Sequence, residues 1–190
     1  LRFFERAEIK DALAYLRLIT NRDSDPAFER VVNLPTRGIG ARTVEAVRQH
    51  AREQGSSLWV AATALSQSGA LPARARTALT GFTSLVTQLA QDAQDLDLSE
   101  KVDLAINRSG LIDHYRKERG EKAITRVENL EELVSAGRNF NIEAENDENT
   151  DPLSDFLAHA ALEAGEGQAD EWEDCVQLMS LHSAKGLEFP

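Results

Sequence analysis

The stretch PTRGIGART, residues 35–43, places two glycines around one isoleucine, between a proline and a threonine. Glycine has no Cβ, so Gly38 and Gly40 can adopt positive φ angles and let another molecule approach the backbone closely. We therefore expect these residues to form either a tight turn or a binding site for a phosphate group. In the turn alternative, Ile39 is buried in the core and the stretch only connects two helices.

On both sides of this stretch, apolar residues recur at intervals of three and four residues, which is typical of amphipathic helices. The spacing predicts one helix over residues 26–33 and another over residues 41–54. Asp25 is expected to cap the first helix, and Gly55 to end the second. Two helices joined by a glycine hairpin resemble the helix-hairpin-helix elements that grip a DNA backbone without reading its sequence, because backbone N–H groups and a helix N-terminus attract phosphate.

The remaining sequence predicts an all-α domain of about eight or nine helices, because the helical spacing continues almost throughout. The other predicted helices are one that spans Ile9 to Ile19, and 57–66, 72–93, 99–108, 111–119, 125–140 and 152–164. The polar segment 141–151 is expected to form a flexible loop. Only CVQLMSLH, residues 175–182, resembles a strand, and a lone strand needs a sheet elsewhere.

These patterns divide the chain into three parts. Residues 1–165 are the all-α domain, residues 166–175 are a linker, and residues 176–190 form a strand-like tail that belongs to a neighbouring domain. The chain does not begin with Met and stops within an apolar run, so we expect it to be a piece of a larger protein.

Charge is distributed unevenly along the 190 residues, whose formal net charge is −11. All lysines and arginines except Lys185 lie in residues 1–138. Around the glycines, residues 30–52 form a basic island in which Glu45 is the only acidic residue. Its arginines are Arg30, Arg37, Arg42, Arg48 and Arg52. Such arginines form either a solvated helix face or a surface for DNA, and the adjacent glycines favour DNA.

Several other classes of function are not expected. No apolar run approaches the roughly 20 residues of a membrane helix, and no signal peptide is visible, so we expect a cytoplasmic protein with no membrane partner. A single cysteine, Cys175, excludes an internal disulfide. The histidines are too widely spaced to suggest a metal site; they are His50, His114, His159 and His182. Trp59 and Trp172 could stack on bases, although Trp59 lies between apolar neighbours and is expected in the core.

Four segments resemble, in the same order, the UvrD/Rep/PcrA group of superfamily 1 DNA helicases. They are RFFERAEIKDALAYLRLI at 2–19, FERVVNLPTRGIGART at 28–43, TRVENLEELV at 125–134 and HAALEAGEGQADEWEDCVQLMSLHSAKGLEFP at 159–190. The resemblance implies that residues 1–165 are the accessory domain called 2B, an all-α insertion in the RecA-like motor domain 2A. It also implies that residues 176–190 carry helicase motif V and return to the motor sheet.

The resemblance also implies which residues contact DNA. The glycine hairpin would touch the duplex ahead of the fork through Thr36, Arg37, Gly38, Ile39, Gly40, Arg42 and Thr43. In motif V, His182 and Lys185 would lie near single-stranded DNA. Glu188 would hydrogen-bond the nucleotide ribose, in the intact helicase only.

By the same resemblance, the parent protein is an ATP-dependent 3′-to-5′ DNA helicase of DNA repair that uses ATP and Mg. The family's ATP-binding loop and Mg-binding acids lie outside this chain, which is therefore expected to hold no cofactor and to be catalytically inactive. Its expected role is to bind duplex DNA and to control the motor by its orientation. Expected partners are duplex DNA, motor domains 1A and 2A, and DNA-repair proteins. The alternative is a protein-interaction and autoinhibitory module with little intrinsic DNA binding.

Overall fold

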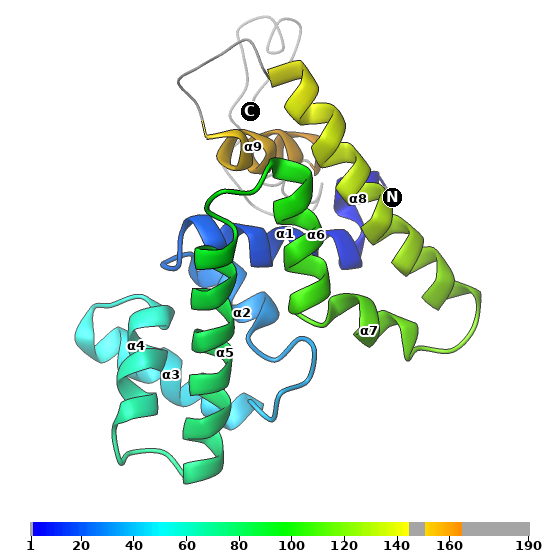
Figure 1. Cartoon of the computed structure of the whole chain (residues 1–190). Coiled ribbons are helices and arrows are strands. Elements are labelled where there is room, and N and C mark those ends of the chain that lie inside the picture. The colour runs from blue at the N-terminus through cyan, green and yellow to red at the C-terminus, as the bar shows by residue number, and fades with distance from the viewer. Residues whose placement is uncertain (1, 145–150, 165–190) are drawn as a thin grey trace, which may run out of the picture.

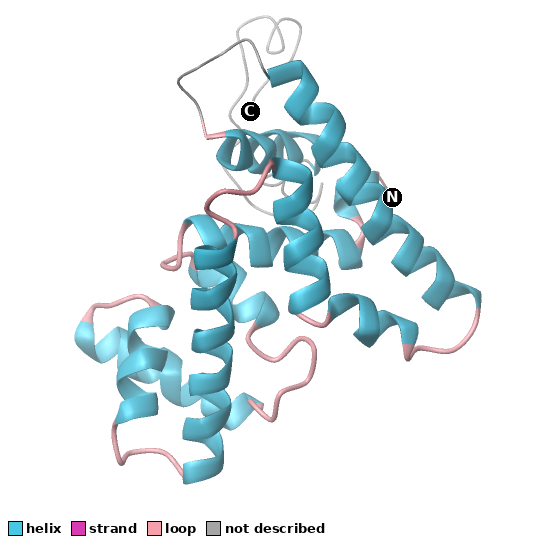
Figure 2. Ribbon diagram, viewed as in Figure 1, coloured by secondary structure: helices cyan, strands magenta, loops and turns pink. Residues whose placement is uncertain are grey.

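The computed structural model describes residues 2–144 and 151–164, and every regular element within these ranges is a helix (Figure 1 and Figure 2). This confirms the predicted all-α class. In chain order the elements are the 3₁₀ helix η1 (Phe3–Glu5) and the α-helices α1 (Ala7–Thr20), α2 (Asp25–Val31), α3 (Ala41–Gln54), α4 (Leu58–Gln67), α5 (Ala73–Asp92), α6 (Leu98–Arg108), α7 (Leu111–Arg116), α8 (Glu121–Ala144) and α9 (Pro152–Ala164).

Helix α1 lies at the centre of the fold and packs against η1, α2, α5, α6, α8 and α9. Its buried side chains lie on several faces, as expected for a helix that is covered all round. Away from α1, α3 packs on α4 and α4 on α5, and these helices form a group at the lower left of Figure 1. On the other side, α8 packs on both α6 and α7. Gly137 of α8 faces α6, and a Cβ there would lie 3.4 Å from Val102, so the two helices approach closely.

Local sequence explains where several helices begin and end. Helix α3 ends at Gly55, which has a left-handed φ of 60°. The Ser57 hydroxyl accepts a hydrogen bond from the Val60 N–H and caps α4. Asp97 and Glu100 form a capping box at the start of α6, in which each side chain accepts a hydrogen bond from the other residue's backbone N–H.

Several helix boundaries differ from the sequence prediction by up to four residues, and two of them change the connecting segments. Helix α7 ends at Arg116 rather than Arg119, because the chain turns at Gly120, where φ is 93°. Helix α8 continues through Ala144, so part of the predicted loop 141–151 is helical. No glycine or proline interrupts this extension, so nothing local stops the helix there. The boundary at 165, the linker 166–175, the strand 175–182 and the motif V tail 176–190 lie outside the described residues and stay predictions.

Asp25 caps a different helix from the one that the sequence indicates. Ser24 occupies the N-cap position of α2, whereas Asp25 Oδ1 accepts a hydrogen bond from the Leu58 N–H at 2.8 Å. Asp25 thereby joins α2 to the first turn of α4.

Replacing Asp25 by Ala is expected to lower the free energy of unfolding by about 1 kcal/mol, because the Leu58 N–H loses its acceptor. Urea denaturation of the variant and the parent chain measures this difference. Asp95→Ala is the matched control, since Asp95 is exposed and forms no hydrogen bond or ion pair within the described residues. Equal effects of the two substitutions would show that the Asp25 contact does not stabilise the fold.

Within the described ranges, no helix combines the length and apolar character needed to cross a membrane. The same residues contain no group of three or more His, Cys, Asp or Glu side chains suited to a metal ion.

Candidate nucleic-acid interface

The glycine loop, residues 33–40, joins α2 to α3 and contacts the junction between α6 and α7. Arg37 Nη2 donates a hydrogen bond to the backbone oxygen of Ser109 at that junction, at 2.9 Å. Gly110 follows with a φ of 84°, and a Cβ on it would lie 3.6 Å from Pro35 Cγ. The loop is therefore held against a part of the fold that is distant in sequence.

Asn33 and Ile39 hold the loop from the inside. Asn33 Oδ1 accepts hydrogen bonds from the N–H groups of Arg37 at 2.8 Å and Ile39 at 3.2 Å. The Ile39 side chain is only 1% exposed and belongs to the core. This is the position that the turn alternative predicts for Ile39. It leaves neither the side chain nor the N–H group of Ile39 available to a phosphate.

The Arg37 guanidinium also makes its contacts within the protein. It donates four hydrogen bonds, to Val31 O (3.3 Å), Pro35 O (2.9 Å), Tyr15 Oη (2.6 Å) and Ser109 O (2.9 Å). Its central carbon lies 5.7 Å from the ring centroids of both Tyr15 and Phe82. Arg37 thus links the loop to α1, α5 and the α6–α7 junction, and most of its donors are already used.

Tyr15 completes this internal anchor. It is fully buried on α1, and its hydroxyl donates a hydrogen bond to the Leu34 oxygen at 2.5 Å. Burial raises the pKa of Tyr15 to about 12, although the Arg37 charge and hydrogen bond act in the opposite direction. The hydroxyl therefore remains protonated at neutral pH and keeps its role as a donor to the loop.

The two glycines have different backbone requirements. Gly38 has a φ of 81°, a conformation that other residues rarely adopt. Gly40 has a φ of −78° and a ψ of 171°, which most residues adopt without strain. Of the two glycines, only Gly38 therefore adopts the positive φ that the sequence allows for both. No atom lies within 4 Å of a Cβ built on Gly40, so its missing side chain leaves open space.

The first turn of α3 presents unused backbone donors next to Gly40. Gly40 is the N-cap residue and has no side chain that could cap the helix. No described residue accepts a hydrogen bond from the N–H groups of Gly40, Ala41 or Arg42, whereas the Thr43 N–H bonds back to the Gly40 oxygen at 2.9 Å. These N–H groups lie at the positive end of the helix dipole, where an anion is favoured.

Most arginines of the predicted basic island are paired with acidic side chains. The pairs are Arg30–Asp11 (2.7 Å), Arg48–Glu29, Arg48–Glu45 (3.3 Å) and Arg52–Glu45 (3.0 Å). Hydrogen bonds from Arg52 and Arg48 hold the pKa of Glu45 below its usual value. Arg42 differs, because it is exposed and no ion pair or hydrogen bond of its guanidinium occurs within the described residues.

The structure therefore separates the predicted site residues into groups. Thr36, Gly38, Gly40 and Arg42 are exposed, and Thr43 is half-buried on the first turn of α3. Arg37 and Ile39 face inward. His182, Lys185 and Glu188 lie outside the described residues.

Sequence reasoning missed two residues that shape the loop, Asn33 and Tyr15. Asparagine side chains often accept backbone hydrogen bonds in turns, so Asn33 carried a usable signal. No sequence pattern indicates the role of Tyr15, because its contact with the loop depends on how α1 packs against α2.

Comparison with known proteins agrees with this helical architecture. The family model for the UvrD-like helicase C-terminal domain matches residues 1–190, the whole chain. The chain belongs to this family.

Curated relatives include helicases from several bacteria. The chain is 60% identical over 190 residues to DNA helicase II of Escherichia coli, and 53% identical over 190 residues to DNA helicase II of Haemophilus influenzae. It is 36% identical over 195 residues to ATP-dependent DNA helicase PcrA of Bacillus subtilis. Each alignment covers 100% of this chain but only 26% of the relative, so the chain spans about a quarter of their length.

Proposed function

We propose that residues 1–165 are the 2B-type accessory domain of an ATP-dependent 3′-to-5′ DNA helicase of DNA repair, and that this domain binds the backbone of duplex DNA through the glycine loop. Membership of the helicase family supports DNA as the partner. Since the chain spans only part of its relatives, helicase activity, with ATP and Mg as cofactors, is assigned to the parent protein. The chain itself is proposed to be inactive and to hold no cofactor.

One observation carries the DNA-binding proposal: at the start of α3, N–H donors and an arginine that have no partner among the described residues occur together with open space. A phosphate there would accept hydrogen bonds from the N–H groups of Gly40, Ala41 and Arg42, and the Arg42 side chain would supply charge. Backbone donors contact phosphate but do not read base edges. Binding is therefore expected to be independent of DNA sequence and steeply dependent on salt.

The remaining site residues have supporting roles in this proposal. Thr36 is exposed in the loop and Thr43 is half-buried on the first turn of α3, and their hydroxyls would donate to the same DNA strand, while Gly38 permits the turn. Arg37 and Ile39 act indirectly, because they hold the loop in shape. His182 and Lys185 near single-stranded DNA, and Glu188 at the nucleotide ribose, are proposed from family membership alone.

The proposed mechanism is positioning rather than bond chemistry. Holding the duplex at the start of α3 would set the orientation of this domain relative to motor domains 1A and 2A, and that orientation would regulate unwinding. DNA-repair proteins are proposed as further partners of the parent. A cytoplasmic location is proposed with the same function.

Replacing Arg42 by Ala is expected to weaken binding to all duplexes alike and to reduce the slope of log affinity against log salt by about one unit, because about one phosphate contact is lost. Fluorescence anisotropy with a labelled duplex at several salt concentrations measures both quantities. The sequence alone predicts a loss of up to about two units for Arg37 and Arg42 together. Because Arg37 makes its contacts within the protein, the double substitution is expected to reduce the salt slope only by the amount that Arg42 contributes.

Arg52→Ala is the matched control, because Arg52 is an exposed arginine of the same helix that is already paired with Glu45. It should leave the salt slope nearly unchanged. Wild-type affinity of Arg42→Ala across the whole salt range would show that the loop is only a turn. The protein-interaction and autoinhibitory module would then be the better interpretation.

A further inference from the structure

A groove of about 410 Å³ lies between α4 and α5, and its lining includes Arg22, Trp59, Ser84, Thr87, Gln88 and Gln91. The sequence predicts Trp59 in the core. In the structure the indole packs against the core but stays half-buried, and it forms one wall of the groove. Part of the indole is therefore open to a ligand.

The polar side chains of the groove have unused hydrogen-bonding capacity. Among the described residues, the side chains of Trp59 and of the four α5 residues form no hydrogen bond. Ser84 and Gln91 are about two helical turns apart, with the other two between them, so the four lie on one face of α5. Residues 77–91 contain no charged side chain, although 28% of the chain is charged. This face thus offers donors and acceptors without a carboxylate that would repel DNA.

Arg22 is the one charged side chain that lines the groove within the described residues. Its guanidinium carbon lies 5.7 Å from the centroid of the Trp59 ring, in cation–π contact. Arg22 is exposed and forms no hydrogen bond or ion pair with a described residue, so this contact is weak and easily exchanged. An aromatic face and an available positive charge thus occur side by side.

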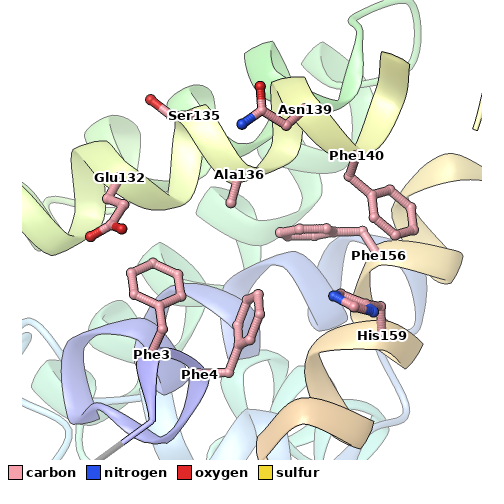
Figure 3. Close-up of a pocket in the computed structure, with 9 residues that line it drawn as sticks. All are labelled: Phe3, Phe4, Glu132, Ser135, Ala136, Asn139, Phe140, Phe156 and His159. Carbon is pink, nitrogen blue, oxygen red and sulfur yellow. The ribbon is translucent and has the colours of Figure 1, made fainter. Parts of the chain in front are cut away.

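A second pocket, of about 510 Å³, lies between η1, α8 and α9 and is more aromatic but less suited to a phosphate (Figure 3). Its Phe140 ring already pairs with Phe156 and His159, with ring centroids 5.4 Å and 5.6 Å apart. Figure 3 shows the Glu132 carboxylate at the other end of the pocket. No lysine or arginine lines it within the described ranges. Of the two, the groove beside Trp59 is therefore the one that can hold a nucleotide.

We propose that the groove between α4 and α5 binds a nucleotide of single-stranded DNA. The base stacks on the Trp59 indole in place of the Arg22 guanidinium, its edge meets the amides and hydroxyls of α5, and Arg22 moves to the phosphate. Stacking on aromatic rings in a positively charged groove is how proteins bind single strands with little sequence preference. Base edges present donors and acceptors together, which amide and hydroxyl side chains match. The groove volume is within the range of about 300–1,000 Å³ that is typical of small-ligand sites.

This site rests on the proposed function, because it takes DNA as the partner, but it selects a separated strand. The bases of a duplex are stacked and paired, so their faces and edges are not free to enter the groove. Helix α4 packs on both α3 and α5, which places the groove and the start of α3 in one group of helices (Figure 1). One domain would then hold the duplex at α3 and a separated strand beside Trp59.

The fluorescence of Trp59 measures occupancy of the groove directly. Trp172→Phe in the 190-residue chain leaves Trp59 as the only tryptophan. A single-stranded dT oligonucleotide of about ten residues is expected to quench the Trp59 emission, because a base stacks on the indole. A blunt duplex of the same length should need at least about tenfold higher concentration for the same quenching, since its bases cannot stack there. Absence of quenching by the single strand would overturn the proposal and would leave the groove to a protein partner.

Groove variants in the Trp172→Phe chain show whether this groove is the site. Arg22→Ala is expected to lower the salt slope of single-strand binding by about 0.7 unit, because about one phosphate contact is lost. Gln88→Ala should weaken single-strand binding about threefold through the loss of a hydrogen bond to the base. Both residues are exposed, so both variants should fold. Arg74→Ala is the matched control, because Arg74 is an exposed arginine of α5 that does not line the groove and should change neither quantity.

Arg42→Ala separates this site from the one at the start of α3, because it should weaken duplex binding and leave quenching by the single strand unchanged. If the single strand quenches Trp59 while Arg42→Ala keeps full duplex affinity, the groove stands and the duplex site fails. Duplex binding without quenching by the single strand has the opposite meaning. Quenching with the affinity of the parent chain in both Arg22→Ala and Gln88→Ala would place the strand elsewhere and overturn the proposal.

Discussion

Gly40→Asp is expected to weaken duplex binding about 100-fold, or roughly 3 kcal/mol, while the stability of the domain is preserved or slightly raised. The backbone at Gly40 accepts any residue, and a Cβ there meets no atom within 4 Å. Aspartate is a favoured N-cap, so its carboxylate would accept hydrogen bonds from the first turn of α3. The same carboxylate would occupy the place of the proposed phosphate and repel the DNA backbone.

Gly40→Asn is the matched control, because asparagine caps a helix about as well as aspartate but carries no charge. It should compete for the same N–H groups without repelling DNA, so the expected loss of affinity is smaller. Anisotropy titration measures affinity, and urea denaturation measures stability. Wild-type duplex affinity in both variants would show that no phosphate binds at the start of α3.

Arg37→Ala is expected to lower the free energy of unfolding by about 2–3 kcal/mol, because a charged donor that serves several buried or half-buried acceptors is removed. The Tyr15 hydroxyl and the Ser109 oxygen each lose this partner. Arg37→Lys should recover only part of the loss, since an ammonium group cannot reproduce the planar arrangement of guanidinium donors. Urea denaturation measures this loss. The slope of the free energy of unfolding against urea concentration should be the same in the variants and the parent chain.

Arg42→Ala serves as the control for this experiment, because Arg42 is exposed and has no partner among the described residues, so its loss should change stability by less than about 0.5 kcal/mol. The two substitutions are thus expected to affect different quantities. Arg37→Ala should lower stability, and Arg42→Ala should lower the salt slope of DNA binding. The anchor interpretation would be contradicted if Arg37→Ala kept the stability of the parent chain and lowered the salt slope by about one unit, because that pattern belongs to a phosphate contact.

The helical framework and the place of the loop within it follow from local features of the sequence. Apolar spacing depends on helix geometry alone, so α3 and α9 appear at the residues that the pattern predicts. Caps such as Gly55 are also local, since they satisfy backbone groups within one turn. The resemblance carried by the quoted segments indicated the family in the same way, because it depends only on the order of residues.

The roles of the residues around the loop, in contrast, depend on how the helices pack. A count of charges finds Arg37 and Arg42 equivalent, yet Arg37 is surrounded by oxygens from α1, the loop and the α6–α7 junction, whereas Arg42 faces solvent. Glu29, which lies just outside the basic island in sequence, neutralises Arg48 because α2 and α3 bring the two side chains together. Partner choice depends on distances between helices, and these distances are set by how the helices pack and not by their spacing along the chain.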